Sequence, residues 1–326
     1  MIITVTTVVV LVIGILSIAL ALYGGYISSE IVDELGSQSE QSQIFEQKYY
    51  LLGMIGTIVL LARLVVVPIY FWMLQSLVPY CPGAMCVSGV TNVSEPYSTI
   101  SMVLKIILTA AYGMWLLVEV SNRRVPTLPF LSKLARSFLL ILLPMLLIDS
   151  AADVLLVASI QPVYAPCCSS VYDVDPPFSP SAMLGPEFGM MILALTVIIS
   201  ITVIMTQWLE PKATIFARLT LLLSLVAATL YLIAIHDTLA PVALGLSNHH
   251  CPYCLFQEFP DTALFAGLFW VGIASACWRV ALEMIWTRRN LDQTTISGIV
   301  DLLRKISSVS ILFSMVSLVS HILVAI

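Results

Sequence analysis

The chain has 326 residues, of which 60% are apolar and only 10% are charged, and its mean hydropathy is +1.01. Soluble globular domains carry about 25% charged residues, so this composition excludes an ordinary soluble protein and predicts an integral, multi-pass protein with membrane lipid around it. The net charge of −5 comes without a clustered basic face, and we therefore expect no nucleic-acid partner.

Eight apolar stretches each approach the roughly 20 residues that cross a bilayer. They cover about 2–23, 49–78, 99–120, 137–160, 187–208, 214–235, 261–283 and 306–326. A backbone in lipid must satisfy its own hydrogen bonds, and these stretches are too long for barrel strands, so all eight should be helices. The predicted fold class is all-α, a polytopic bundle. The start of the chain lacks the basic region of a secretory signal, which predicts a retained first helix.

We divide the predicted helices into three segments. Residues 1–136 hold three spans, 137–284 hold four, and 285–326 hold the last span. An amphipathic run at about 291–305 precedes that last span and predicts a helix along the membrane interface.

Basic residues set the expected orientation because Lys and Arg stay in cytoplasmic loops. Ten of the 14 basic residues lie in alternate loops: Arg123, Arg124, Lys133, Arg136, Lys212, Arg218, Arg288, Arg289, Arg304 and Lys305. The loops at 80–98, 161–186 and 236–260 contain none. This asymmetry places both termini and these three loops on the non-cytoplasmic side, with Lys48 as the one basic residue of the first cytoplasmic loop.

Six of the seven cysteines form three close pairs in the loops that lack basic residues. The pairs are Cys81/Cys86, Cys167/Cys168 and Cys251/Cys254. On the non-cytoplasmic side disulfides form and persist, so the three pairs indicate thiol–disulfide chemistry at one membrane surface. Cys81/Cys86 is interpreted as an auxiliary pair, and six cysteines leave 15 pairings open.

The strongest motif is Cys251-Pro-Tyr-Cys254, which follows His249 and His250. A thiolate at the start of a helix is stabilised by free N–H groups, and neighbouring imidazoles can handle the released proton. We expect Cys251 to be the exposed attacking thiol and Cys254 the deeper, resolving one. Two alternatives remain: a structural disulfide, or a zinc or copper site formed by His249, His250, Cys251 and Cys254.

Cys167 and Cys168 lie in a proline-rich loop. Six prolines surround them: Pro162, Pro166, Pro176, Pro177, Pro180 and Pro186. Such a loop favours extended, exposed chain that can reach another site. Adjacent cysteines bond to each other only with strain, so one of them should exchange with a partner elsewhere. The alternative is a static disulfide to Cys81 or Cys86.

From the fourth span onward, the order is helix, cysteine loop, two helices, and a CxxC that opens a fourth helix. Over about residues 137–284 this order resembles the core of the vitamin K epoxide reductase family and the analogous DsbB-type thiol oxidases. The resemblance implies that Cys167 or Cys168 is the shuttle, that Cys251 is its partner, and that Cys254 delivers electrons to a quinone bound among the helices.

Pro260 departs from that pattern because it interrupts the helix after the CxxC. We therefore expect the motif on a short surface helix, with Asp261 or Thr262 capping the following membrane helix.

Charged residues inside the apolar stretches need partners. Counting depth from the span ends pairs Arg63 with Asp149 and Lys105 with Asp153. The two pairs either fix helix packing or, through the two aspartates together with His249 and His250, handle protons.

Three further features concern single positions. His236-Asp237 ends the sixth span and is either a metal-orienting pair or a helix-capping histidine. His321 and Cys277 are single residues on apolar helices and are interpreted as packing residues.

The sequence thus predicts a membrane thiol–disulfide oxidoreductase that passes electrons between a periplasmic or luminal thiol protein and a membrane quinone, in either direction. The alternatives are a copper- or zinc-binding membrane protein and a structural subunit, assembled with other membrane subunits, whose outer loops are stapled by disulfides. A transporter lacks the supporting pattern of inverted repeats.

Overall fold

The computed structural model describes residues 2–36, 43–165, 179–209 and 214–325. The structure is 86% helical, without strands in these ranges. The same ranges contain eight helices that are long and apolar enough to cross a membrane. The predicted all-α class is therefore confirmed, and eight such helices are consistent with a multi-pass membrane protein.

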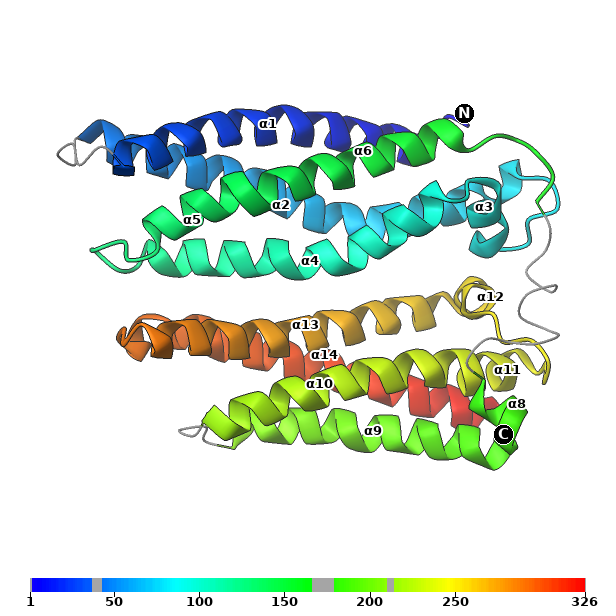
Figure 1. The fold of residues 1–326 in the computed structure, drawn as a ribbon. Helices are drawn as coiled ribbons and strands as arrows, with labels where there is room; N and C mark the ends of the chain where they lie inside the picture. Colours follow the sequence, from blue (N-terminus) through cyan, green and yellow to red (C-terminus); the bar gives the residue numbers. More distant parts are fainter. Residues whose placement is uncertain (1, 37–42, 166–178, 210–213, 326) are drawn as a thin grey trace. The chain divides into compact units, whose positions relative to one another are not determined.

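The helices form two compact units, Met1–Ala165 and Pro166–Ile326. Unit 1 contains four long helices, α1, α2, α4 and α6, which run alongside one another (Figure 1). Its elements are α1 (Val5–Gly36), α2 (Gln43–Leu77), η1 (Val78–Tyr80), α3 (Val87–Val93), α4 (Tyr97–Asn122), α5 (Leu131–Ser137), η2 (Phe138–Leu142) and α6 (Leu143–Ser159).

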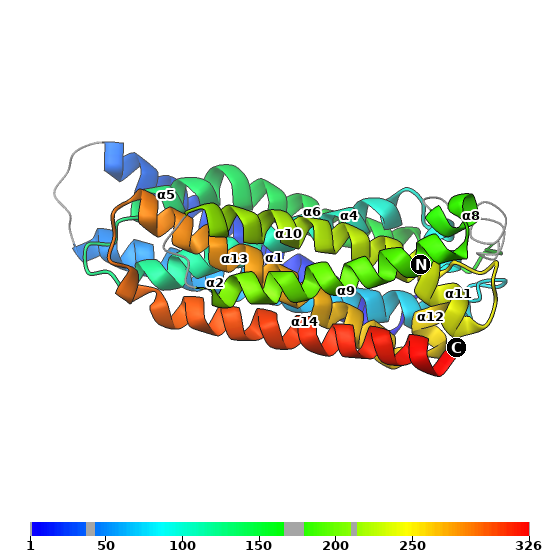
Figure 2. The ribbon, with the colours of Figure 1, turned by 90° about the horizontal axis from the view of Figure 1, so that it is seen from below.

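Unit 2 is a second bundle, built on α9, α10, α13 and α14 (Figure 2, α14 in red). Its elements are α8 (Pro180–Leu184), α9 (Pro186–Trp208), α10 (Thr214–Ala234), η3 (Ile235–Leu239), α11 (Ala240–Leu244), α12 (Pro252–Glu258), α13 (Pro260–Arg288), η4 (Gln293–Thr295) and α14 (Ser297–Ala325). α13 packs along α14, and α9 along α10.

These units differ from the predicted segments. The fourth span, α6, packs against α1 and α4, so it belongs to unit 1 and not with α9, α10 and α13. The last helix packs against α13 and α9, so it completes unit 2. The predicted boundaries after residues 136 and 284 do not coincide with the single division at 165/166.

Two long helices each widen into a π-helical turn that ends two residues before a proline. η2 precedes Pro144 and η3 precedes Pro241. A proline lacks the N–H that would bond four residues back, and its ring collides with that carbonyl. A wider turn removes this conflict without ending the helix.

Two local predictions about unit 2 are wrong. The interfacial helix at 291–305 is not separate, because α14 runs unbroken from Ser297. The short surface helix after the CxxC is present as α12, but neither Asp261 nor Thr262 caps α13. The N-cap is Phe259, whose carbonyl accepts the Thr262 hydroxyl.

One end of unit 1 is closed by a polar network around the buried carboxylate of Glu119. Tyr49 donates to Glu119 Oε2 at 2.5 Å, and Arg123 Nε donates to Oε1 at 2.7 Å. Asn122 donates to the Tyr49 hydroxyl and accepts the Phe130 N–H. These contacts tie α2 and α4 to the start of α5.

Candidate functional site

The CxxC motif lies at the start of α12 in unit 2. Cys251 is the N-cap residue, and Pro252 occupies the first helical position. The sulfur atoms of Cys251 and Cys254 lie within 4.8 Å of each other, so a small side-chain rotation would bring them to bonding distance.

The exposure of the two thiols is the reverse of the prediction. Cys251 is buried, whereas Cys254 is partly exposed. The N-cap follows directly on the loop from α11, and α11 packs against α12. Of the two thiols, Cys254 is therefore the more accessible to a partner.

Histidines surround the start of this motif. His250 is buried, and its Nδ1 lies 3.2 Å from the carbonyl oxygen of His236. The His236 and His250 rings meet edge to face, with centroids 5.9 Å apart. Because a carbonyl only accepts, Nδ1 of His250 carries the hydrogen in this contact.

Asp237 anchors the chain that enters unit 2. Its Oδ1 accepts hydrogen bonds from the Ser179 hydroxyl at 2.6 Å, the Ser181 N–H at 3.0 Å and the Ser181 hydroxyl at 2.7 Å. Its side chain is buried. The sequence predicts a metal-orienting or helix-capping role for His236-Asp237. In the structure the Asp237 carboxylate instead binds the segment at Ser179 and Ser181.

The auxiliary pair lies in unit 1. Cys81 follows η1 and Cys86 is the N-cap of α3; both are buried. Burial raises the pKa of the Cys81 thiol above its ordinary value. Between the two cysteines, Gly83 has φ +85°, a conformation that favours glycine.

Cys167 and Cys168 lie outside the described residues. The chain before them ends its described part at Ala165, whose N–H donates to Pro82 O at 2.8 Å. Only Pro166 separates Ala165 from Cys167 in the sequence. The described chain stops at Ala165, beside the Cys81/Cys86 loop, and begins again at Ser179, whose hydroxyl donates to Asp237.

The predicted intramembrane ion pairs are both present in unit 1, and they form one cluster. Arg63 Nη2 lies 2.6 Å from Asp149 and 2.8 Å from Asp153. Lys105 Nζ lies 2.6 Å from Asp149 and 2.8 Å from Asp153. Tyr112 donates to Asp149 at 3.1 Å. Each carboxylate thus faces both cations.

Solvent exposure favours the packing role for this cluster. The four charged side chains are no more than 2% exposed, and their charges sum to zero. Breaking such a cluster leaves a buried charge uncompensated, which is costly. Proton handling by Asp149 and Asp153 stays a prediction.

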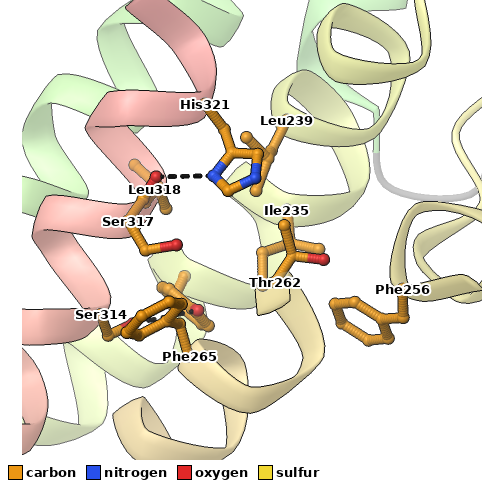
Figure 3. Close-up of a pocket in the computed structure, with 10 residues that line it drawn as sticks. Ile235, Leu239, Phe256, Thr262, Phe265, Ser314, Ser317, Leu318 and His321 are labelled. Atoms are coloured by element: carbon orange, nitrogen blue, oxygen red, sulfur yellow. Dashed lines mark hydrogen bonds between the residues drawn. The ribbon is translucent and has the colours of Figure 1, made fainter. Parts of the chain in front are cut away.

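A small cavity lies beside α12 among α10, α13 and α14 (Figure 3). Its wall combines aromatic rings with hydroxyl groups and one imidazole. The lining residues are Tyr231, Ile235, Leu239, Phe256, Thr262, Phe265, Ser314, Ser317, Leu318 and His321. Phe256 lies two residues after Cys254, which brings this cavity next to the CxxC helix.

His321 is more than the predicted packing residue. Its Nε2 lies 3.2 Å from Asp261 Oδ2, and its Nδ1 lies 2.9 Å from Ser317 O. The sequence signal that could have found it is the depth match between an intramembrane histidine and a carboxylate at the start of the preceding span. Cys277, in contrast, is a half-buried residue of α13, as expected.

The cavity is too small for the predicted quinone. Its volume is about 10 Å³, which corresponds to about one water molecule. The lining chemistry suits a ring with oxygen acceptors, but a quinone ring does not fit in this conformation. No protein-family model, curated protein or solved structure matches this chain.

Proposed function

We propose that this protein is a membrane thiol–disulfide oxidoreductase whose working pair is Cys251 and Cys254. The observation that supports the proposal is the approach of the two sulfur atoms to within 4.8 Å at the start of a short helix, in a CxxC that follows the buried His250. Labile cysteine pairs exchange disulfides, whereas structural disulfides resist reduction.

The proposed reaction is an exchange of one disulfide for one dithiol. A thiolate of the reduced protein attacks a disulfide of its partner, a mixed disulfide forms, and the second thiol of the attacking pair displaces the partner's thiolate. Two electrons and two protons change sides in the complete exchange. His250, which directly precedes the motif, is the candidate to take up the proton that the attacking thiol releases.

Accessibility assigns the order of attack. Cys254 is partly exposed and Cys251 is buried, so Cys254 meets the partner first and Cys251 resolves the mixed disulfide. Cys167 and Cys168 are proposed as the shuttle that carries electrons from a periplasmic or luminal thiol protein. The lack of basic residues in all three cysteine loops supports a non-cytoplasmic location.

A quinone as the electron acceptor stays a prediction, because the cavity beside α12 does not admit its ring. Purified protein mixed with a soluble ubiquinone analogue provides a direct test. Quenching of tyrosine and tryptophan fluorescence that saturates with the analogue would support a quinone site in this protein. Unsaturable quenching would contradict it.

The redox proposal is tested on the full-length protein in glutathione buffers of graded potential. Each cysteine is alkylated at equilibrium with isotopically distinct reagents for reduced and oxidised thiols, and then quantified by mass spectrometry. We expect Cys251 and Cys254 to titrate together between about −300 and −120 mV, the range of catalytic pairs. Cys277, a single thiol on a membrane helix, serves as the internal control and should stay reduced.

Two outcomes would overturn the proposal. A pair that stays oxidised in every buffer would indicate a structural subunit with stapled loops. A pair that binds stoichiometric copper or zinc, measured by elemental analysis before and after chelation, would indicate a metal-binding protein.

The order of attack is tested separately with single cysteine variants. Cys251→Ser should trap a mixed disulfide with the partner through Cys254, and Cys254→Ser should trap far less.

A further inference from the structure

One face of α14 carries a row of polar residues over about half of the helix, from Ser307 to His321. Ser307, Ser310, Ser314 and Ser317 are all buried, and His321 continues the same row. The spacing of three or four residues places them on one side of the helix, turned into the interior of unit 2. A membrane bundle gains little from hydroxyl groups in this position unless they find partners.

The partners come from three other helices of unit 2. Gln207 Nε2 of α9 lies 3.0 Å from Ser307 Oγ, and the Tyr231 hydroxyl of α10 lies 3.2 Å from Ser314 Oγ. At the CxxC end, both nitrogens of His321 face acceptors, the carboxylate of Asp261 and a carbonyl oxygen.

The opposite end of the row has a second ion pair. α13 runs antiparallel to α14, with Asp261 beside His321 and the α-carbon of Gly272 facing Ser307 and Ile311. Continuing this register places Arg279 about one helical turn beyond Ser307. Arg279 Nη1 lies 3.0 Å from Glu283 Oε1. A partly exposed carboxylate therefore marks each end, because the Asp261 side chain is 50% exposed and that of Glu283 is 22% exposed.

Several polar atoms in this interior have no hydrogen-bond partner among the residues that the structure describes. They are Ser200 Oγ, Gln207 Oε1 and Arg279 Nε, and their side chains are buried. An unsatisfied buried polar group costs about 1–3 kcal/mol. Proteins ordinarily satisfy such groups with internal water. The cavity beside Tyr231, Ser314 and His321 has about the volume of one water molecule.

We propose that unit 2 holds a file of water molecules along the serine face of α14, and that protons move along it between the His321–Asp261 pair and the Arg279–Glu283 pair. Successive polar residues of the row are three or four positions apart, which is about 4.5–6 Å along a helix. One water with hydrogen bonds of about 2.8 Å on each side spans such a gap.

The path has the length that a membrane requires. From the level of Arg279 to His321 it extends over about 18 residues of α14, or roughly 27 Å, against a hydrocarbon core of about 30 Å. One proton enters at one carboxylate for each proton released at the other, and no electron transfer is involved. The proposal is therefore independent of the thiol chemistry.

Close helix packing alone does not explain these observations. Small residues do let α13 and α14 approach, as Gly272 shows, but packing leaves no reason for unsatisfied amide, hydroxyl and guanidinium atoms in the same interior. Internal water satisfies them and accounts for the cavity.

X-ray radiolysis in solution tests for the water directly, because bound water produces hydroxyl radicals next to buried side chains. Met315 and Tyr231 are each 3% exposed and lie beside the row. We expect both to be oxidised at least fivefold faster than Met73 of unit 1, which is 0% exposed. Rates for Met315 and Tyr231 no higher than that of Met73 would overturn the proposal.

Proton movement is tested in vesicles that contain the protein and an internal pH dye, with valinomycin clamping the potential after a pH step. Ser314→Val should reduce the protein-dependent proton flux at least fivefold, because it removes a hydroxyl and fills the adjacent cavity. Thr229→Val, which removes an exposed hydroxyl on α10, should leave the flux unchanged.

Ser310→Val is the second variant should Ser314→Val fail to fold, as judged by size-exclusion chromatography. If vesicles with the natural protein show the same proton flux as protein-free vesicles, the proposed proton conduction is wrong, even if radiolysis detects internal water. Neither result bears on the redox titration of Cys251 and Cys254, so failure of one proposal is distinguishable from failure of the other.

Discussion

The aspartates of the unit 1 cluster each serve two cations, and this sets the cost of losing one. In Asp153→Asn, Arg63 and Lys105 would share Asp149 alone and leave one positive charge buried without compensation. We expect a loss of about 3–5 kcal/mol in unfolding free energy, measured in detergent by urea titration. Asp301→Asn is the matched control, because Asp301 pairs with Arg304 and Lys305 at the surface, where ion pairs contribute at most about 1 kcal/mol.

A charge swap tests whether the four residues act as one cluster. Arg63→Asp or Asp149→Arg alone changes the buried charge by two units, and either variant should fail to accumulate. The double variant restores neutrality, so it should accumulate better than both. It should still be less stable than the natural protein, because the carboxylate introduced on α2 faces Asp153 and the guanidinium introduced on α6 faces Lys105. Full recovery would show that only the Arg63–Asp149 contact matters.

The pH dependence of Cys81 follows from its burial. The thiolate is the reactive form, and the raised pKa of this thiol lowers the thiolate fraction at any given pH. Iodoacetamide modification of Cys81 in the reduced protein should therefore be slow at pH 8 and keep increasing above the value of about 8.5 at which an ordinary thiol is half ionised. Peptide mass spectrometry measures the rate of Cys81 modification from pH 7 to 10. A rate that reaches a plateau near pH 8.5 would contradict the raised pKa of Cys81.

Among the elements, α13 and α14 approach each other closely at Gly272. A β-carbon there would lie 2.6 Å from Ile311 Cγ1 and 3.1 Å from the backbone oxygen of Ser307. Gly272→Ala should destabilise the protein by about 1–3 kcal/mol, as overpacking does. Gly267 on the same helix has nothing within 4 Å, so Gly267→Ala should cost nothing. Thermal unfolding of both variants checks the difference, and equal midpoints would show that the helices can move apart.

Sequence patterns predict elements well where hydropathy alone decides them. All eight spans are present because each apolar stretch is long enough to need lipid. The prediction of a separate interfacial helix before the last span is wrong because Arg304 and Lys305 resemble the polar side of such a helix. In the structure their charges are matched by Asp301 on the same helix, so the helix continues straight into the bundle.

Side-chain partnerships were less predictable than spans. Arg63 and Asp149 could be paired by depth, since both lie far inside their helices. The same depth match pairs His321 with Asp261, but the prediction of a helix cap at Asp261 takes that carboxylate out of the comparison. The relative exposure of Cys254 and Cys251 depends on how the chain around them folds. Hydropathy periodicity in the sequence does not predict it.

For the whole molecule, the division into two units separates the features by kind. Unit 1 contains the charge-neutral cluster of two cations and two aspartates and the buried Cys81/Cys86 loop. Unit 2 contains the CxxC motif and the buried serine face of α14. Each unit has four long helices. If every one of them crosses the membrane, the chain leaves each unit on the side of the membrane where it entered. Two, four and six of these helices precede the Cys81/Cys86, Cys167/Cys168 and Cys251/Cys254 loops. Each loop thus follows an even number of crossings, and we expect all three on one side of a membrane.

That topology is the last prediction. A short epitope inserted after Ser247, in the exposed loop before the CxxC, should be labelled by an antibody in intact spheroplasts. The same epitope after Gln293, between Arg289 and Arg304, should be labelled only after the membrane is permeabilised, because basic loops stay in the cytoplasm. Exposed loops tolerate such insertions. The reverse pattern would place every cysteine loop in a reducing compartment, where an exchangeable Cys251–Cys254 disulfide would not persist, and the proposed redox function would fail with it.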